Sequence, residues 1–172
     1  TSGIHIPDHK QQMVFNRITK RIQTLGIASI DQYMGYLKDE KNANEIVNLV
    51  NALTTNVTDF FRESHHFEHL KTQLSTMRAK GQKRLRLWSA GCSIGAEPYS
   101  AAMTLYEAMQ NPADMDFKIL ATDIDTNALQ KGRDAIYTAG QIKGLSQERQ
   151  KKFFVRAPGA DADALQVKTH IR

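Results

Sequence analysis

The residues that could do chemistry gather around two glycines, Gly91 and Gly95, and one carboxylate, Asp123. Alternating arginine and leucine predict a strand that begins at Arg84, and the glycines then permit a turn with backbone angles closed to other residues. A helix is expected after the turn, so that backbone N–H groups and the positive helix end face whatever lies above the strand. A second candidate strand, 117–122, ends directly before Asp123. A carboxylate in this place can accept hydrogen bonds from both hydroxyls of a ribose.

This βαβ unit has two interpretations. The glycines alone fit a structural turn, and many βαβ units bind no ligand there. Asp123 favours a ligand, but it lies farther beyond Gly91 than the roughly 20 residues that the dinucleotide fingerprint expects. The turn also lacks the G-x-G-x-x-G spacing that binds a pyrophosphate. A ligand with an adenosine and no pyrophosphate therefore fits better, and an NAD-dependent oxidoreductase is the least favoured class.

A second group of candidate ligands consists of three histidines, His65, His66 and His69, at the start of a predicted helix. His65 and His69 are four residues apart, so they could share a helix face and a metal. No motif supplies the further ligands that a zinc site needs. Solvated histidines on a polar helix face are the favoured interpretation, and no metal is expected.

The elements that must position these groups fall into two regions. In the first third of the chain, capping residues and apolar periodicity predict three helices, which begin near Asp8, Ser29 and Asn42. Beyond them, a helix from about Phe67, the two strands and a helix after Asp125 alternate. Shorter elements are expected toward the C-terminus. The order predicts a small helical unit followed by an α/β unit.

Composition excludes several classes of protein. The chain has 172 residues with a 41% hydrophobic and a 24% charged share, which is typical of a soluble globular protein. No apolar run approaches the roughly 20 residues of a membrane span, so the protein is not expected to be membrane-inserted. The single cysteine, Cys92, cannot form an internal disulfide, which favours a reducing cytoplasm. The net charge of +5 suggests an acidic partner, either nucleic acid or an acidic protein surface.

The first predicted helix carries the clearest basic side, formed by Lys10, Arg17, Lys20 and Arg21. Periodicity alone slightly favours a solvated face. The alternative is an electrostatic dock for an acidic partner, and the absence of acidic residues between Lys10 and Arg21 supports it. The basic side lacks the interleaved aromatic residues that stack on bases, so nucleic acid is not the expected partner.

Three ordered segments, 54–67, 88–100 and 121–126, resemble the chemotaxis receptor methyltransferases of the CheR family. The first contains Thr54-Thr-Asn-Val-Thr-Asp-Phe-Phe-Arg62, the second Trp88-Ser-Ala-Gly-Cys-Ser-Ile-Gly-Ala-Glu-Pro-Tyr99, and the third Ala121-Thr-Asp-Ile-Asp-Thr126. The helix from Asp8 to Gly26 is also similar to the basic helix of that family. The resemblance covers nearly the whole chain.

The resemblance implies an α+α/β fold in four parts. An all-helical N-terminal domain would occupy residues 1–53 and carry the basic, receptor-facing helix. Residues 54–66 would be a linker that contributes to the cofactor site, and residues 67–136 the front part of a Rossmann-like, S-adenosylmethionine-dependent methyltransferase domain. An inserted antiparallel β-subdomain would occupy residues 137–172. Later family segments are missing, so the methyltransferase domain is expected to be partial.

The resemblance also implies a reaction, methyl transfer from S-adenosylmethionine to a receptor glutamate, which gives a methyl ester and S-adenosylhomocysteine. Glutamate has a pKa of about 4.3, so its carboxylate is already a nucleophile at neutral pH and needs no general base. Proximity and orientation can then supply much of the rate. This agrees with the lack of any obvious catalytic triad in the sequence.

Residue roles are carried over by matching position. The expected cofactor contacts are Asn56, Thr58, Arg62, Gly91, Glu97 and Asp123, with Asp123 on the ribose. Arg62 is also the candidate catalytic residue, since a guanidinium can steer the substrate carboxylate. The expected contacts with the acidic helical domain of a chemotaxis receptor are Lys10, Arg17, Lys20 and Arg21. The protein is expected to be a cytoplasmic monomer.

Two departures from the family pattern leave an alternative open. Ile94 stands where the family usually has threonine, and Ala96 where it has the first of two glutamates; the second, Glu97, remains. Together with the missing later segments, they allow a non-catalytic adaptor or S-adenosylmethionine sensor that binds a receptor or another acidic partner. A pattern with which some members hold a receptor peptide is met by Arg156 and Gly159 but not by the two other positions, Ala157 and Gln166.

Overall fold

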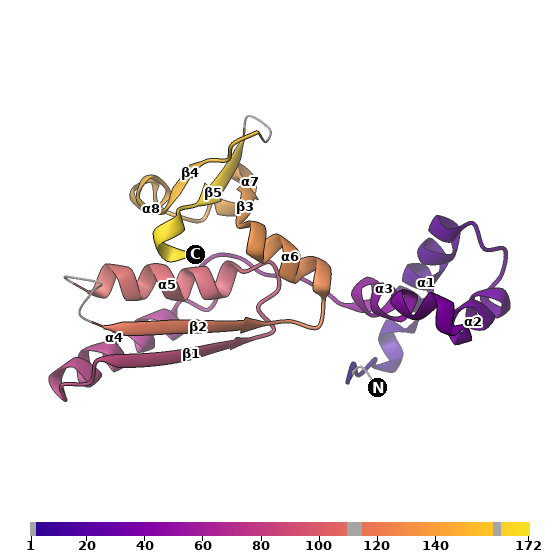
Figure 1. Cartoon of the computed structure of the whole chain (residues 1–172), viewed down its shortest axis with the longest axis horizontal. Helices are drawn as coiled ribbons and strands as arrows, with labels where there is room; N and C mark the ends of the chain where they lie inside the picture. Colours follow the sequence, from indigo (N-terminus) through magenta and orange to yellow (C-terminus); the bar gives the residue numbers. More distant parts are fainter. Residues whose placement is uncertain (1–2, 110–114, 160–162) are drawn as a thin grey trace. The chain divides into compact units, whose positions relative to one another are not determined.

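A computed structural model describes residues 3–109, 115–159 and 163–172 (Figure 1). The chain divides into two units. The first, called the helical unit here, comprises Thr1–Thr55 and Ile124–Asn127, and the second comprises Asn56–Asp123 and Ala128–Arg172. The short segment Ile124–Asn127, which directly follows Asp123, therefore belongs to the helical unit, although it is distant in sequence from the rest of that unit.

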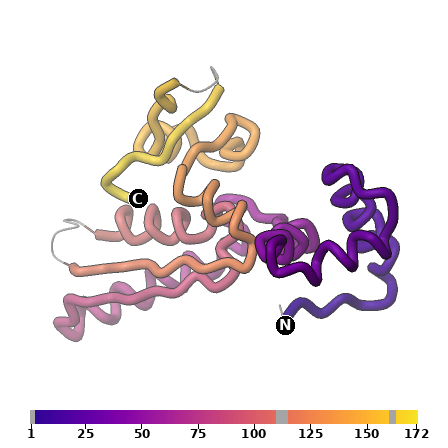
Figure 2. The backbone as a smooth tube through the Cα atoms, turned by 45° about the vertical axis from the view of Figure 1, so that its right-hand side comes forward, coloured from indigo at the N-terminus to yellow at the C-terminus, as the bar shows by residue number. Residues whose placement is uncertain are grey.

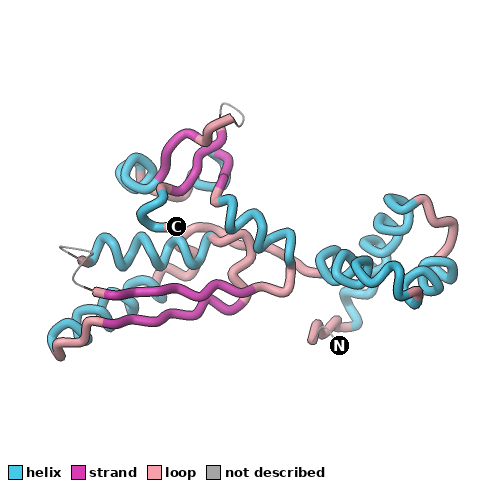
Figure 3. The backbone as a smooth tube through the Cα atoms, in the orientation of Figure 1, coloured by secondary structure: helices cyan, strands magenta, loops and turns pink. Residues whose placement is uncertain are grey.

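The helical unit contains α1, α2 and α3, which are connected by short turns (Figure 3). As predicted, Gly26 ends the first helix in the left-handed conformation, and Ser29 caps the second by accepting a hydrogen bond from the Gln32 amide. Asn42 makes no capping bond with its side chain, so that part of the prediction is wrong. The bounds are η1 Asp8–Lys10, α1 Gln11–Leu25, α2 Ile30–Lys38, η2 Glu40–Asn42 and α3 Ala43–Leu53.

A buried carboxylate, Glu45 of α3, links the helices of this unit. Its side chain is 4% exposed and accepts hydrogen bonds from Arg21 of α1 at 2.6 Å, from the Tyr33 hydroxyl of α2 at 2.8 Å and from Asn48 at 3.2 Å. The hydrogen bond from the Arg21 guanidinium is the largest of the effects that lower the pKa of Glu45 to about 2. Since several donors satisfy the charge, the carboxylate can stay ionised although it is buried.

The second unit begins with a helix and a βαβ arrangement. β1 and β2 pair in parallel, with Leu87 opposite Ile119, and α5 connects them (Figure 1). Leu74 of α4 and Leu105 of α5 pack on the same face of this sheet. The bounds are α4 His65–Ala79, β1 Arg84–Ala90, α5 Ala96–Ala108 and β2 Asp116–Thr122. The opposite face of the sheet carries Trp88, which is 67% exposed.

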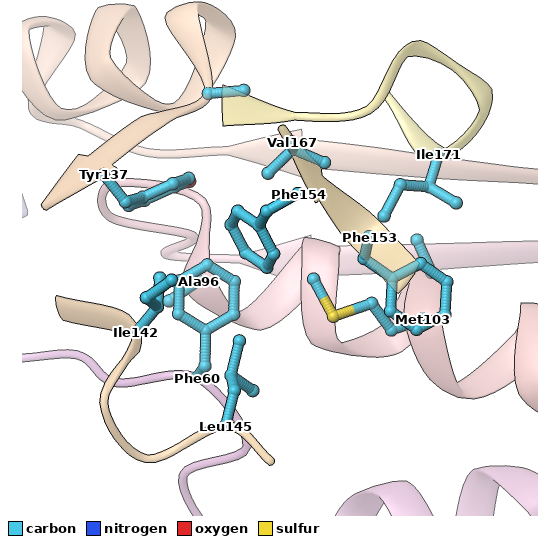
Figure 4. Packing of buried hydrophobic residues seen from close by; sticks show 12 residues of the cluster. Phe60, Ala96, Met103, Tyr137, Ile142, Leu145, Phe153, Phe154, Val167 and Ile171 are labelled. Carbon is cyan, nitrogen blue, oxygen red and sulfur yellow. The ribbon is translucent and has the colours of Figure 1, made fainter. Parts of the chain in front are cut away.

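The C-terminal part of the second unit forms a small antiparallel sheet in the order β3-β5-β4, and η4 then lies against α5 (Figures 1 and 2). Its core contains Tyr137, Phe153 and Phe154, which pack with Met103 of α5 (Figure 4). The bounds are α6 Thr126–Asp134, β3 Ile136–Thr138, α7 Ala139–Ile142, α8 Gln147–Phe153, β4 Phe154–Arg156, β5 Ala164–Val167 and η4 Thr169–Ile171. The expected fold class is confirmed: a helical unit precedes an α/β unit that carries a small antiparallel sheet.

Among the described residues, none of the helices combines the length and apolar character needed to cross a membrane. Within the same ranges, histidine, cysteine and carboxylate side chains form no group of three that could hold a metal ion. Nδ1 of His65 lies 3.8 Å from a carboxylate oxygen of Glu63, and its ring meets that of His66 edge to face.

The Glu45 network makes stability depend on pH in a defined window. The pKa of Glu45 is about 2 in the folded chain against an ordinary value of 4.5, so the ionised group contributes stability that is complete above about pH 4.5. That contribution is lost as the pH falls toward about 2. We expect Glu45→Gln to cost about 3 kcal/mol near pH 6, and much less near pH 3, in urea unfolding followed by circular dichroism.

The matched control is Glu40→Gln, which removes an exposed carboxylate of η2. Its effect on the free energy of unfolding should be small at both pH values. A Glu45→Gln cost that does not change between the two pH values would contradict the assignment.

Candidate functional site

The turn between β1 and α5 folds over the end of β2. Gly91, Ser93 and Gly95 all have positive φ, at 82°, 50° and 90°. The amides of Gly91 and Cys92 both donate to the Thr122 carbonyl, at 2.8 and 2.9 Å. The last residue of β2 therefore fixes the start of the turn, because one carbonyl accepts two successive N–H groups.

Asp123 is held at this place by the same turn. Its Oδ2 accepts a hydrogen bond from the Ser93 amide at 2.6 Å. Ser93 is buried, and its hydroxyl lies 3.4 Å from the Asn56 side-chain oxygen. The structure thus brings together three predicted positions, Gly91, Asp123 and Asn56, from the turn, the second strand and the linker. Sequence reasoning missed Ser93, whose contribution is a backbone N–H that every residue type except proline carries.

Glu97 lies in the first turn of α5, where a negative charge is favoured by the helix dipole. Its carboxylate accepts a hydrogen bond from the Ser89 hydroxyl at 2.5 Å. Ser89 is a buried residue of β1, so the strand orients the carboxylate at the start of the helix. The alternation of the strand could have indicated Ser89, because it is a polar residue on the face that packs inward.

The linker forms a closed loop. Arg62 donates from its guanidinium to the Val57 carbonyl at 2.7 Å, and the half-buried Thr58 lies between them. The residues on both sides of Arg62, Phe61 and Glu63, have φ of 55° and 53° although neither is glycine. Such conformations cost on the order of 1 kcal/mol or more each and often mark functional segments.

The strained loop is anchored by its aromatic residues. Phe60 is buried and makes edge contacts with Tyr137 at 5.0 Å and Phe154 at 5.7 Å between ring centroids (Figure 4). The Phe61 amide donates to the Ser100 hydroxyl of α5 at 2.9 Å. Packing against α5 and the small sheet therefore anchors the loop that carries Arg62.

Space for a ligand exists above the turn. A Cβ added to Gly91 would meet no atom within 4 Å, whereas one added to Gly95 would lie 3.1 Å from both Gly132 and Tyr137. Gly91 therefore faces open space, and Gly95 is required by packing. An open backbone beside the carboxylates of Asp123 and Glu97 suits a ligand that carries a ribose diol and a positive charge.

A cavity of about 770 Å³ lies along β2, between α5, α6 and the C-terminal residues. It reaches Asp123 and Cys92, but Glu97 and Arg62 do not line it. The cavity therefore reaches only part of the predicted site, at the end of β2 and the turn after β1.

The basic side of α1 is only partly exposed. Arg17 donates to the carbonyls of Leu53 at 2.8 Å and Thr54 at 2.5 Å, at the end of α3. Arg21 is paired with Glu45. Lys10 and Lys20 are exposed. The sequence argument considered acidic residues only within the same helix, and so it missed Glu45, which comes from α3.

Comparison with known families divides the chain close to the linker. Residues 1–54 match the family model described as CheR methyltransferase, all-alpha domain, and residues 56–172 match the model described as CheR methyltransferase, SAM binding domain. The turn, Asp123, Glu97 and Arg62 all lie within the second match.

Three curated relatives are chemotaxis protein methyltransferases. The chain is 39% identical over 170 residues to the chemotaxis protein methyltransferase of Salmonella typhimurium. The match covers 99% of this chain and 57% of that protein. It is 37% identical over 170 residues to the chemotaxis protein methyltransferase of Escherichia coli, and this match covers 99% of the chain and 58% of that protein. The identity to the chemotaxis protein methyltransferase 2 of Pseudomonas aeruginosa is 37% over 171 residues. This match covers 99% of the chain and 60% of that protein. The chain thus spans less than two thirds of each of these relatives.

The two glycines of the turn provide a matched pair of variants. Gly91→Ala introduces only the strain of a left-handed alanine, about 1–2 kcal/mol. Gly95→Ala adds overpacking against Gly132 and Tyr137, so its total cost should reach about 3 kcal/mol or more. Thermal unfolding would measure both costs, and equal costs would contradict the packing role of Gly95.

Proposed function

Since the chain belongs to the CheR methyltransferase family, we propose that the protein containing it transfers the methyl group of S-adenosylmethionine to glutamate side chains of a chemotaxis receptor. The observation that carries the proposal is the Asp123 carboxylate at the tip of β2, held by the Ser93 amide beside an open glycine turn. This is the place where an adenosyl ribose is bound in open α/β sheets.

The chain's own residues supply distinct contacts to the cofactor. Asp123 would accept hydrogen bonds from the ribose hydroxyls, and Gly91 leaves room for the ligand to approach the backbone. Glu97 offers a carboxylate to the ammonium group of the methionine part. Asn56, Thr58 and Arg62 would contact the cofactor from the linker. When bound, S-adenosylmethionine supplies an electrophilic methyl group on a positively charged sulfur.

The substrate glutamate is ionised at neutral pH, so one of its oxygens can attack the methyl carbon without a general base. Methyl transfer to this carboxylate would need no proton transfer, so none of the chain's residues would have to act as an acid or a base. Arg62 would orient the substrate carboxylate through charge-assisted hydrogen bonds. The strained and anchored loop fixes Arg62 before the substrate arrives, which reduces the entropy that must be lost during the reaction.

For the receptor, we propose docking of its acidic helical cytoplasmic domain on α1. Lys10 and Lys20, whose side chains are exposed, would make the direct contacts. Arg17 and Arg21 would support that surface from their internal hydrogen bonds. We place the reaction in the cytoplasm and expect a monomer.

The alternative of a non-catalytic adaptor rested on Ile94 and Ala96 together with the missing later family segments, and the structure bears on the two residues. Ala96 is 1% exposed in the core of the second unit, and Ile94 packs against the same core. The changes therefore fall on the packed side of the turn, while Glu97 is exposed. This favours the enzyme over the adaptor.

The full-length protein should transfer labelled methyl groups from S-adenosylmethionine to receptor-containing membranes, and the label should be released as methanol by base, as a methyl ester requires. Asp123→Asn should weaken S-adenosylhomocysteine binding by about tenfold or more in isothermal titration, because ribose bonds to a charged acceptor are lost. The control is His69→Ala, an exposed substitution on α4. Binding without base-labile label would favour the adaptor, and no binding at millimolar ligand would refute the cofactor site.

A second variant separates the two roles of Arg62. Arg62→Lys keeps the positive charge but loses the planar fork that matches a carboxylate. We expect KM for the receptor to rise or kcat to fall by about tenfold, with a smaller change in S-adenosylhomocysteine affinity. An unchanged methylation rate would exclude Arg62 from orienting the substrate.

A further inference from the structure

An ion pair joins two helices of the second unit. Arg149 lies on α8, which precedes the small sheet's β4, and Glu107 lies on α5 (Figure 1). The guanidinium donates from two nitrogens to the two oxygens of the carboxylate, at 2.8 and 2.7 Å. The two side chains are only 28% and 22% exposed. Since both oxygens are engaged, the pair fixes the plane of the guanidinium, and its hydrogen bonds raise the pKa of Arg149 above its ordinary value.

The same guanidinium lies over the ring of Phe61 in the linker. The distance from Cζ of Arg149 to the ring centroid is 4.0 Å, which is within the range of a cation–π interaction. The ring also meets that of Phe67 in α4, with 5.0 Å between the centroids and 60° between the planes. Because Glu107 restricts where the guanidinium can lie, the ring of Phe61 is held by a group that is itself fixed.

Phe61 directly precedes Arg62, the candidate for orienting the substrate carboxylate. The φ of Phe61 is 55°, a strained value for a residue other than glycine, so contacts of this residue must maintain it. One such contact is the hydrogen bond from its amide to the Ser100 hydroxyl, and the others are made by its ring. Loss of a ring contact would let the backbone relax and would change the direction in which Arg62 projects.

We propose that Arg149 and Glu107 are positioning residues, which hold Arg62 in place through the ring of Phe61. This inference rests on the proposed function, in which Arg62 orients the receptor glutamate. Arg62 is exposed, and its hydrogen bond to the Val57 carbonyl lies within the same loop. The conformation of the loop therefore determines where its guanidinium lies. Productive geometry in a site tolerates displacements of only about 0.5 Å, so a loosened Phe61 should slow methyl transfer.

The first experiment needs neither cofactor nor substrate. In the full-length protein, hydrogen exchange of the Phe61 amide reports the order of the loop, since that amide bonds Ser100 of α5. Arg149→Met should raise this exchange by about tenfold relative to core amides of α5. Arg149→Lys should raise it by about threefold, because lysine keeps a charge opposite Glu107 but loses the planar group over the ring.

The matched control is Lys152→Met, which removes another cation of α8. The Lys152 ammonium lies 5.9 Å from the ring centroid of Tyr106 and 5.3 Å from that of Phe153, and neither ring belongs to the linker. This variant should leave the Phe61 exchange ratio unchanged. Equal exchange at Phe61 in the wild type and in Arg149→Met would overturn the proposal, and so would an equal rise in the Lys152→Met control.

The second experiment is a double-mutant cycle on the methylation of receptor-containing membranes by the full-length protein. Arg149→Met and Glu107→Ala should each lower kcat/KM for the receptor by about tenfold, because orientation of the substrate is lost. In an Arg62→Ala background, Arg149→Met should have little further effect. An equal loss in both backgrounds would show that Arg149 does not act through Arg62. Absence of methylation by the wild type would count against the proposed function, and the exchange experiment would still decide whether Arg149 holds the loop.

Discussion

The hydrogen bond from the Ser93 amide to the Asp123 carboxylate, at 2.6 Å, is the contact on which the candidate site depends. It joins the turn after β1 to the residue after β2, and both strands are held in parallel register. A charged acceptor strengthens such a bond. Because Ser93 must take a positive φ of 50° to direct its N–H at the carboxylate, the glycines on either side carry the rest of the sharp turn. The neighbouring Thr122 carbonyl, which accepts two amides, reinforces the same geometry.

Two residues of the linker have strained backbone conformations. Phe61 and Glu63 are in the left-handed region, and the burial of Phe60 and the bond from the Phe61 amide to Ser100 hold them there. The cost is small beside the free energy of burying an aromatic side chain. The result is a loop that presents Arg62 from an ordered backbone. The proposed reaction, whose nucleophile is already ionised, would depend above all on orientation, which such a loop provides.

Basic residues that form one pattern in the sequence of the helical unit have different surroundings in the structure. The four basic residues of η1 and α1 are a uniform set in the sequence, but they divide into two kinds in the structure. Arg21 balances the buried Glu45, and Arg17 binds the carbonyls that end α3, whereas Lys10 and Lys20 are exposed. Guanidinium groups with several fixed donors suit internal carboxylates and carbonyls, and ammonium groups remain hydrated. A partner surface on this helix would therefore depend on its lysines more than on its arginines.

Local chemistry in the sequence determined the helical unit and the βαβ unit, because caps, periodicity and glycine turns are short-range signals. The small antiparallel sheet was expected only from the family resemblance. Local chemistry also singled out Gly91 and Asp123 as candidates, since each follows the end of a predicted strand, whereas Glu97 became a candidate through the family resemblance. The pairing of Arg21 with Glu45, the anchoring of Phe60, and the contact of the Arg149 guanidinium with Phe61 were decided only by the tertiary structure. These contacts join residues far apart in the chain, and whether a polar side chain finds such a partner depends on packing that no local pattern encodes.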